Sequence, residues 1–438
     1  MWSPAISFEK GHLTAGGLNA RALATEFGTP TFFIDEDHFR ARAAAWAHSL
    51  QANFGPSAGN VYYAAKAFIC TDIARWIKEE GIGIDVCTGG ELAVALAGGI
   101  DPKKIEVHGN NKSVVEIERA VKAGVKTIVI DSLFEIERVA AAATKHGVRQ
   151  AVMLRLTPGV EAHTHESIST AHEDVKFGFS IASGAASVAV TAVLSHASLE
   201  LLGFHCHVGS QIFGTDSFEL AATRIIALMA ECKNKHGIEL PELDLGGGYA
   251  IAYMPGDVTV EPDDVLPALS AVVKRECAAA GLALPIISIE PGRNIVGPTT
   301  FTLYEVGTVK DVVLEDGSTR RYISVDGGMS DNLRPSLYGA EYFAVLADRV
   351  STAAHALSRV VGKHCETGDI VIRDIQLPSD IAPGDLLATP ATGAYGRSMA
   401  SNYNHVPRPP VVAIKNGKAR VIVRRENEAD LLALDVKE

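Results

Sequence analysis

The stretch VYYAAKAF, residues 61–68, is a short apolar run that delivers a single lysine, Lys66, where the run ends. Valine, tyrosine and phenylalanine favour extended backbone, so the run is predicted to form a buried strand with Lys66 just past its end. Burial among Tyr62, Tyr63 and Phe68 disfavours the ammonium form and leaves an amine suited to forming a Schiff base. Because most lysines at strand ends only reach solvent, a catalytic Lys66 needs support from the rest of the chain.

Seven further apolar runs repeat this pattern, each ending in polar or glycine residues. They are GIDVC (83–87), KIEVHGN (104–110), TIVIDS (127–132), QAVMLRL (150–156), LLGFHCHVG (201–209), ELDLGGG (242–248) and PIISIEPGR (285–293). Helical spacing separates them at 71–80, 89–97, 113–123, 133–146, 214–236 and 262–281. Such near-continuous apolar runs are typical of parallel strands covered by helices, and eight strand–helix units predict a closed (β/α)8 barrel. An open doubly wound sheet is the alternative.

If the barrel closes, the polar residues that end these runs meet at one rim, where barrel enzymes keep their active sites. They are Lys66, His108, Asn110, Asp131, Arg155, His207, Gly246, Gly247, Gly248 and Arg293. The barrel is therefore expected to carry its chemistry at this rim.

The sequence pattern changes after about residue 300, which predicts a second domain. Short β-rich segments such as FTLYEVGTVKDVVL and HVPRPPVVAIKNGKARVIVRR alternate there with Gly, Pro and Asp turns. We expect residues 30–300 to form the barrel, beginning with a strand PTFFID and a helix over 37–51. Residues 1–29 and 301–438 are expected to form an all-β sandwich or Greek-key barrel that contributes substrate-binding and catalytic residues.

Composition narrows the function. The 438 residues carry a net charge of -12 without a basic stripe, which argues against nucleic acid and anionic membrane as partners. No apolar run approaches membrane-spanning length and the N-terminus lacks the pattern of a secretory signal, so a cytoplasmic location is expected. The six cysteines are scattered without CxxC spacing, which suggests neither a disulfide framework nor a structural zinc site.

Two neighbouring loops are predicted to bind a phosphate. Gly246, Gly247 and Gly248 follow an apolar LDL and let the backbone approach an anion closely, while the next run ends in EPGR, residues 290–293. Barrels often bind phosphate with the loops after their last two strands. Ser210, directly after Gly209, is placed to donate its hydroxyl to the same group.

The run HCHVGSQ offers a histidine to either a metal or a cofactor. Alternation puts His205 and His207 on one face, and a metal site could join them to His163 and His165, but no CxxC-type or helix-borne ligand completes it. A flat imidazole packed against a flat cofactor ring suits His207 better. We therefore expect no metal.

Together these motifs resemble the diaminopimelate decarboxylases, barrel enzymes that depend on pyridoxal 5′-phosphate. The resemblance rests on AAKAF (64–68), GIDVCTGGEL (83–92), HGNNKS (108–113), THESISTAHEDVKFGF (164–179), GFHCHVGSQ (203–211), LDLGGGYAIAY (243–253), EPGR (290–293), DGGMSDNLRPSLY (326–338), GKHCETGD (362–369) and GAYGRSMASNYN (393–404). It runs through nearly the whole chain, and Thr88, Ala171 and the GYAIAY segment are modest departures from the family pattern.

The resemblance implies decarboxylation of meso-2,6-diaminopimelate to L-lysine, and it assigns cofactor roles. Lys66 would bond covalently to the cofactor, His207 would stack on its ring, and Glu290 would pair with the pyridine nitrogen and keep it protonated. The phosphate would be held by Ser210, Gly246, Gly247, Gly248, Pro291, Gly292, Arg293 and Tyr395.

The resemblance also implies how the substrate is recognised. Arg293 and Arg334 would fork onto its distal carboxylate, with Tyr338 and Tyr395 as hydroxyl donors and Glu366 accepting the distal ammonium group. Cys365 would supply a proton to the carbon that loses carbon dioxide. The family assembles its site across a two-fold dimer interface, so a homodimer with shared active sites is expected.

Three alternatives stay open. A decarboxylase of the same fold could act on ornithine, arginine, carboxynorspermidine or a D-amino acid, although Arg334 argues against a substrate without a distal carboxylate. A non-catalytic homologue that only binds partners is disfavoured by the presence of both Lys66 and Cys365. A barrel racemase would share the lysine but should lack the CETGD thiol.

Overall fold

The computed structural model describes residues 1–9, 11–56, 59–159 and 176–436, and its contacts divide the chain into two compact units. One, the barrel unit, comprises Arg42–Ala250 and Val260–Asn294. The other, the β unit, comprises Met1–Ala41, Ile251–Thr259 and Ile295–Glu438. Among the residues described, none of the helices combines the length and apolarity needed to cross a membrane.

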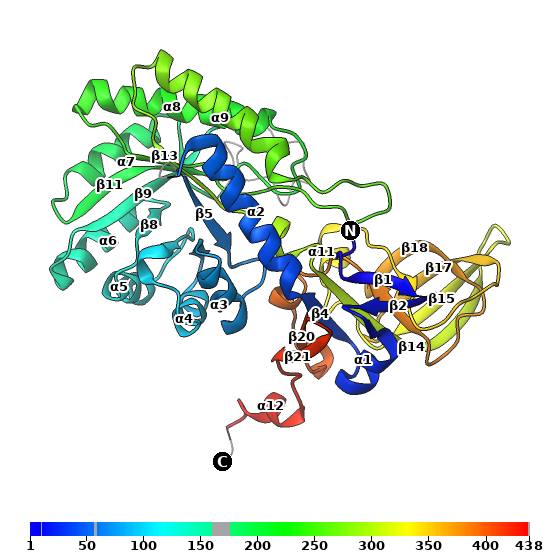
Figure 1. Ribbon diagram of the computed structural model, residues 1–438. Coiled ribbons are helices and arrows are strands. Elements are labelled where there is room, and N and C mark those ends of the chain that lie inside the picture. Colours follow the sequence, from blue (N-terminus) through cyan, green and yellow to red (C-terminus); the bar gives the residue numbers. More distant parts are fainter. Residues whose placement is uncertain (10, 57–58, 160–175, 437–438) are drawn as a thin grey trace. The chain divides into compact units, whose positions relative to one another are not determined.

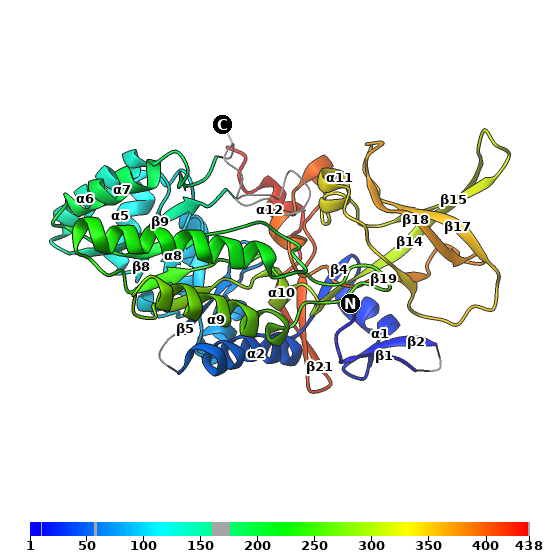
Figure 2. The ribbon, with the colours of Figure 1, turned by 90° about the horizontal axis from the view of Figure 1, so that it is seen from above.

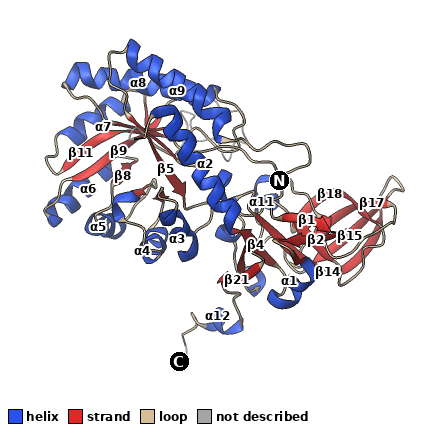
Figure 3. Cartoon of the chain, in the orientation of Figure 1, coloured by secondary structure: helices blue, strands red, loops and turns tan. Residues whose placement is uncertain are grey.

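Eight parallel strands close into a barrel, as the eight apolar runs predicted (Figures 1 and 3). In chain order they are β5 (Gly59–Ala64), β6 (Gly83–Val86), β7 (Ile105–Val107), β8 (Thr127–Ile130), β9 (Gln150–Thr157), β11 (Leu199–Cys206), β12 (Glu242–Asp244) and β13 (Ile286–Ile289). The order around the barrel is β9-β11-β12-β13-β5-β6-β7-β8, and the pairing of β8 with β9 closes it. The short strand β10 (Phe179–Ser180) extends β9. The open doubly wound sheet is excluded.

Helices cover the outside of this barrel. They are α3 (Thr71–Glu79), α4 (Gly89–Ala97), α5 (Val114–Ala123), α6 (Leu133–His146), α7 (Ala185–Leu194), α8 (Asp216–His236) and α9 (Pro262–Ala279), and α2 (Glu36–Phe54) runs from the β unit into the barrel unit. Figure 2 shows the long helices α8 and α9 packed side by side.

Local sequence explains where these helices begin and end. At the start of α5, Ser113 and Glu116 form a capping box, and Gly124 ends the helix in the left-handed conformation. Thr88, a departure from the family pattern, caps α4 by accepting the Glu91 N–H at 3.2 Å. Threonine at this position therefore caps the helix despite departing from the family pattern.

The barrel interior is unusually polar. Six of its strand residues with no solvent exposure are Asp85, Glu106, Thr127, His205, Asp244 and Ser288. Neighbours in this set occupy paired positions on adjacent strands, such as Asp85 opposite Glu106 and His205 opposite Asp244, so they share one face of the sheet. A barrel core usually consists of branched apolar side chains, so this layer places charge and hydrogen-bonding capacity beneath the rim.

The β unit is built on a mixed sheet in the order β18-β17-β15-β14-β4-β20-β21, with β16 and β19 beside β14. Its main strands are β4 (Thr31–Asp35), β14 (Thr300–Val313), β15 (Thr319–Val325), β16 (Val345–Leu346), β17 (His355–Val361), β18 (Ile370–Pro378), β19 (Leu386–Thr389), β20 (Val411–Lys415) and β21 (Lys418–Val423). A small sheet of β1 (Ile6–Glu9), β2 (His12–Ala15) and β3 (Leu18–Asn19) precedes it, and the helices are α1 (Ala20–Phe27), α11 (Arg334–Tyr338) and α12 (Glu428–Leu432). The four-residue α10 (Arg293–Val296) spans the junction of the two units.

The unit boundaries differ from the expected positions at residues 30 and 300. Strand β4 was expected to open the barrel domain, but it pairs with β14 and β20 and belongs to the β unit. Residues 251–259 also belong to the β unit, although they follow the glycine triplet of the barrel. The first difference arises from long-range strand pairing and the second from packing of Ile251 and Tyr253 in the core of the β unit, and local sequence patterns contain neither.

A tight contact between two barrel strands gives a test of the fold. Gly203 of β11 lies opposite Glu242 of β12, and a Cβ at Gly203 would sit 1.7 Å from the Glu242 carbonyl oxygen. Gly203→Ala should therefore lower the free energy of unfolding in urea by about 3 kcal/mol, because paired backbones cannot separate without losing hydrogen bonds. Gly214→Ala is the matched control, since nothing lies within 4 Å of its added Cβ. Equal stability of the two variants would contradict the β11–β12 pairing.

Candidate active site

The predicted rim residues gather at the carboxyl ends of the parallel barrel strands. Asp131, His108, His207 and Glu290 each follow directly after the last residue of their strand, and Lys66 lies two residues beyond β5. Parallel strands in one closed sheet end on the same side, so these side chains come from neighbouring positions around one mouth. Asn110 is exposed, whereas Arg155 lies within β9 itself.

Lys66 is held on a tight turn. The Ala67 N–H donates to the Ala64 carbonyl at 3.1 Å, and the buried Tyr63 hydroxyl donates to the Phe68 carbonyl at 2.6 Å. The turn therefore presents a half-buried Lys66 from a rigid base. The predicted burial by Tyr63 and Phe68 fits this geometry, whereas Tyr62 accepts a hydrogen bond from Lys126.

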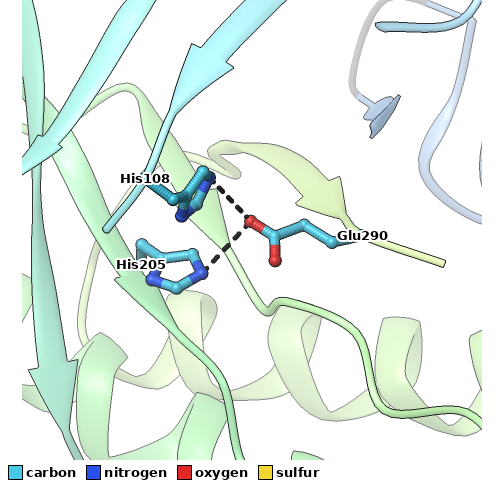
Figure 4. Close-up of side chains that lie close together, drawn as sticks. All are labelled: His108, His205 and Glu290. Carbon is cyan, nitrogen blue, oxygen red and sulfur yellow. Dashed lines mark ion pairs between the residues drawn. The ribbon is translucent and has the colours of Figure 1, made fainter. Parts of the chain in front are cut away.

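Glu290 lies at the centre of the mouth and faces two histidines (Figure 4). Its Oε1 is 3.0 Å from His108 Nε2 and 3.2 Å from His205 Nε2, and all three side chains are almost completely buried. The separations are short, but the ring N–H directions diverge from the oxygen, so neither contact is an aligned hydrogen bond. Two imidazoles thus converge on one carboxylate oxygen.

The two histidines differ in charge. Burial lowers the pKa of a histidine, yet the charge of Glu290 outweighs burial at His108 and raises its pKa to about 10. At His205 burial dominates and lowers the pKa to about 4. Burial alone would raise the pKa of Glu290, but the interaction with His108 first, and the contact with His205 second, hold it well below its usual value. Glu290 is therefore ionised, His108 is a cation and His205 is neutral at neutral pH.

His207 is also held neutral. Burial lowers the pKa of His207 well below its usual value, and the charges of Lys66 and Arg155 lower it further. Its Nδ1 accepts the Gly247 N–H at 3.3 Å, which fixes the ring against the glycine loop. The structure thus brings Lys66, His207 and the glycine triplet into one neighbourhood, as the sequence predicted.

The glycine triplet is required first by backbone packing. An added Cβ would lie 2.3 Å from the Cys206 oxygen at Gly246, 2.2 Å from the Glu290 oxygen at Gly247 and 2.4 Å from the Gly209 oxygen at Gly248. The N–H groups of Gly246 and Gly247 donate to Asp244 and His207. Gly248 is thus the member of the triplet best placed to donate to an anion.

Arg293 and Ser210 meet at the edge of the same mouth. The Arg293 Nη2 donates to the Ser210 hydroxyl at 2.8 Å, and Arg293 is 8 % exposed. Pro291 and Gly292 between Glu290 and Arg293 are buried, and a Cβ on Gly292 would press on Ala64 at 2.7 Å. The EPGR loop therefore packs against the turn that carries Lys66.

These residues fit pyridoxal phosphate. Glu290 Oε1 and both ring nitrogens of His205 are buried without an aligned hydrogen-bond partner in the described part of the chain, so polar capacity is left over beneath the mouth. An amine, a neutral imidazole, an ionised carboxylate and an arginine beside a serine are the donor set for an aldehyde, a ring, a pyridinium nitrogen and a phosphate.

The same residues could in principle bind a metal. His108, His205 and Glu290, or Glu106, Asp244 and Glu290, each bring three ligand atoms within 4.8 Å of one another. A protonated His108 cannot coordinate a cation, and its charge already balances Glu290. His163 and His165, the other histidines of the metal interpretation, lie outside the described residues, as does most of the THESISTAHEDVKFGF motif.

Among the predicted substrate residues of the β unit, Arg334 is the buried one. It begins α11 and is 6 % exposed, with its guanidinium 4.6 Å from the ring centre of Tyr253 and 5.5 Å from that of Tyr342. Its Nη1 donates to the Tyr342 hydroxyl. Among the described residues no carboxylate forms an ion pair with Arg334, its Nε has no hydrogen-bond partner, and aromatic rings and one hydroxyl surround the buried cation.

The loop that carries Cys365 and Glu366 is fixed by Asp369. The buried Asp369 carboxylate accepts the N–H of Met329 at 2.6 Å and that of His364 at 2.8 Å. The His364 ring lies between Ser330, at 2.8 Å from Nε2, and Asn404, at 3.2 Å from Nδ1. Cys365 and Glu366 themselves are exposed on this rigid base.

Tyr395 and Tyr338 are both half-buried in the β unit. Tyr395 has φ +61°, a left-handed conformation that a tyrosine rarely adopts. Such strain is often found where function fixes a side chain. The predicted site residues thus form two groups, one in the barrel unit and one in the β unit.

Sequence reasoning missed the roles of His108, His205 and Asp369. His108 was noted only as a rim residue and His205 only as a possible metal ligand. The signal that could have found them is position, because His205 alternates with His207 and His108 directly ends an apolar run. Asp369 carries no local signal beyond its place in the CETGD motif.

Comparisons with known proteins agree with these findings. Residues 36–297 match the family model of the pyridoxal-dependent decarboxylases, pyridoxal binding domain. Diaminopimelate decarboxylase from Mycobacterium tuberculosis (strain ATCC 25618 / H37Rv) is 54 % identical over 433 residues, covering 98 % of this chain and 96 % of the relative. The Bacillus subtilis (strain 168) protein of the same name is 42 % identical, covering 98 % and 96 %. The crystal structure of diaminopimelate decarboxylase from m. jannaschii in complex with L-lysine superposes with a TM-score of 0.92 at 29 % identity, covering 100 % of this chain and 99 % of that one.

Asp369 gives a test of the site geometry. Asp369→Ala leaves the N–H groups of Met329 and His364 buried without an acceptor, so it should lower the free energy of unfolding in urea by about 3 kcal/mol. Asp311→Ala is the control, because Asp311 is an exposed partner of Arg321 and its loss should change stability little. Similar effects of the two changes would mean that the Asp369 contacts do not hold the loop.

Proposed function

The chain belongs to the diaminopimelate decarboxylases, within the pyridoxal-dependent decarboxylase family, and from this premise we propose that it converts meso-2,6-diaminopimelate to L-lysine and carbon dioxide. The reaction would serve as the last step of lysine biosynthesis. The observation that most directly supports a substrate with two amino acid heads is Arg334, a buried guanidinium without a carboxylate partner in the described chain.

Lys66, Glu290 and His207 would bind the reactive part of the cofactor. Lys66 would bond pyridoxal 5′-phosphate until the substrate amine displaces it, and the cofactor would supply an electron sink for the pair that departing carbon dioxide leaves behind. An ionised Glu290 favours a proton on the pyridine nitrogen, which strengthens this electron sink, and a neutral His207 can lie flat against the ring. The burial of Glu290 excludes the water that would otherwise screen its charge.

The phosphate would lie where the loops after β12 and β13 meet. Gly248 and the backbone of Pro291 and Gly292 offer close approach, while Arg293 and Ser210 offer a cation and a hydroxyl that already contact each other. We propose that Gly246, Gly247 and Tyr395 complete this cradle. Gly246 and Gly247 would act mainly by letting the loops pack closely.

Arg334 would bind the distal carboxylate. A guanidinium fork matches a carboxylate, and its loss of water on folding has already been offset by Tyr253 and Tyr342. Arg293 would assist from the barrel, with Tyr338 donating a hydroxyl and Glu366 accepting the distal ammonium group. A substrate that lacks the second carboxylate would leave Arg334 unpaired, which disfavours ornithine and lysine.

Cys365 would deliver the proton that replaces carbon dioxide. Its thiol is exposed to solvent, while the loop that carries it is fixed by Asp369. We propose that the chain acts as a homodimer in which the loop of one copy serves the barrel of the other, because an isologous interface supplies two such exchanges at once. A cytoplasmic location is proposed as well, since all six cysteines are free thiols.

A substrate panel tests the proposed reaction. Purified protein with pyridoxal phosphate should release carbon dioxide from meso-diaminopimelate and produce L-lysine, with little or no release from ornithine, arginine or lysine. Preferred turnover of ornithine, arginine, carboxynorspermidine or a D-amino acid would assign the chain to another decarboxylase of this fold. A protein that binds no cofactor would be a non-catalytic homologue, and interconversion of stereoisomers without loss of carbon dioxide would indicate a racemase.

Within the same assay, Arg334→Ala should retain the yellow cofactor but lower kcat/KM for meso-diaminopimelate on the order of 100-fold, because a buried charge pair with the substrate is lost. Arg349→Ala is the control, since Arg349 pairs with Asp380 and Asp385 at the surface and should leave kcat/KM unchanged. Normal turnover by the Arg334 variant would remove it from substrate recognition.

Mixing two inactive variants tests the shared site. Lys66→Ala and Cys365→Ala should each be inactive alone, but subunits exchanged between them at equal amounts should regain about a quarter of wild-type activity, because half of the dimers hold one intact site. No recovery after confirmed subunit exchange would mean that each copy uses its own Cys365.

A further inference from the structure

We propose that His108 is a positioning residue that, as a cation, keeps Glu290 charged, while the neutral His205 packs against the same carboxylate oxygen. The geometry supports this proposal, because both imidazoles approach Oε1 of Glu290, His108 at 3.0 Å and His205 at 3.2 Å (Figure 4). Both act on one oxygen, which leaves Oε2 as the atom for a further cationic partner. The inference rests on the proposed role of Glu290 beside the pyridine nitrogen.

Burial makes such a cation necessary. Glu290 is 3 % exposed, and an isolated carboxylate at that depth takes up a proton because losing water costs its charged form more. A protonated Glu290 would be a poor partner for a protonated pyridine. His108, 4 % exposed, lies also 3.9 Å from Glu106, so it has two carboxylates to stabilise its own charge.

His205 cannot replace His108. It has no solvent exposure, lies 3.2 Å from the same oxygen and stacks edge-on against His108 with ring centres 4.8 Å apart. Two adjacent imidazolium ions would repel each other, so only one of them carries the proton. The pKa values agree, since that of His108 is raised to about 10 by Glu290 against the effect of burial, and burial lowers that of His205 to about 4.

Other charges face this cluster from several strands. From β6, β7, β9 and β12, from the turn after β5 and from α4, the groups are Asp85, Glu106, Arg155, Asp244, Lys66 and Glu91. The carboxylates Asp85 and Asp244 are buried, and burial raises the pKa of Asp85 to about 7. Burial also raises the pKa of Asp244 well above its usual value, so these two acids are not full negative charges at neutral pH, and His108 is the cation in contact with the Glu290 oxygen.

Unfolding in urea at different pH values tests the proposal on the full-length protein stripped of cofactor. A histidine whose pKa is raised on folding adds stability that is complete below its unfolded pKa of about 6.5 and is lost as the pH rises towards 10. The ratio of the unfolding equilibrium constants of H108Q and wild type should therefore shrink between pH 6.5 and 10, by up to about tenfold for each pH unit.

H205Q is the matched control. A histidine with a lowered pKa titrates below about pH 6.5, so the corresponding ratio for H205Q should stay constant between pH 7 and 10. A constant ratio for H108Q, or equal trends for both variants, would overturn the proposal. Should H108Q not fold, E290Q replaces it. Removing the anion beside His108 predicts the same decrease, with rising pH, in the ratio of the unfolding equilibrium constants of variant and wild type.

Cofactor binding gives an independent readout. The dissociation constant of pyridoxal phosphate should rise for H108Q as the pH falls from 8 to 6, on the order of tenfold relative to wild type, because Glu290 then gains a proton. H205Q should show no such trend. A loss of cofactor affinity that is independent of pH in both variants would mean that the two histidines act only by packing. Since these measurements use no substrate, their failure is distinguishable from failure of the proposed reaction.

Discussion

A negative charge buried where the barrel strands end is the constraint on which the rest of this site depends. Barrel closure brings His108, directly after β7, and His205 of β11 to the same oxygen of Glu290, and in our proposal the charge on His108 keeps Glu290 ionised. In an open sheet those strands would end far apart and the carboxylate would be neutral or exposed. The polar layer beneath the mouth, the glycine loops and the fixed turn of Lys66 all surround this one charge.

Much of the fold could be predicted because its signals are local. Each barrel strand is an apolar run ended by polar or glycine residues, and the helical periodicity between the runs gave α4 and α6 at their observed bounds. Helix α7 was not predicted, because its sequence AASVAVTAVL is rich in valine and lacks a polar face. The partners of β4 escaped because β14 and β20 lie hundreds of residues away. The polar interior was hidden within runs that look apolar, since Asp85 and Ser288 are single residues flanked by isoleucine and valine.

The site was predictable to the extent that motifs name residues. Lys66, His207, Gly247 and Glu290 follow from their strands and from family resemblance, and the structure places them at one mouth. Interactions between motifs were not predictable. Nothing in HGNNKS indicates that His108 carries a charge for a carboxylate in EPGR, and nothing in CETGD indicates that Asp369 ties two loops together through their N–H groups. Such contacts depend on the closed fold.

The pairing of β4 also bears on how the chain matures on the ribosome. β4 is synthesised among the first residues, yet its parallel neighbour β20 comes from the opposite end of the sequence. The barrel unit comprises no residue beyond Asn294, so all of its strands are synthesised before β20. A polypeptide that stops before residue 411 would therefore display a bare hydrogen-bonding edge on β4, a template for misassembly.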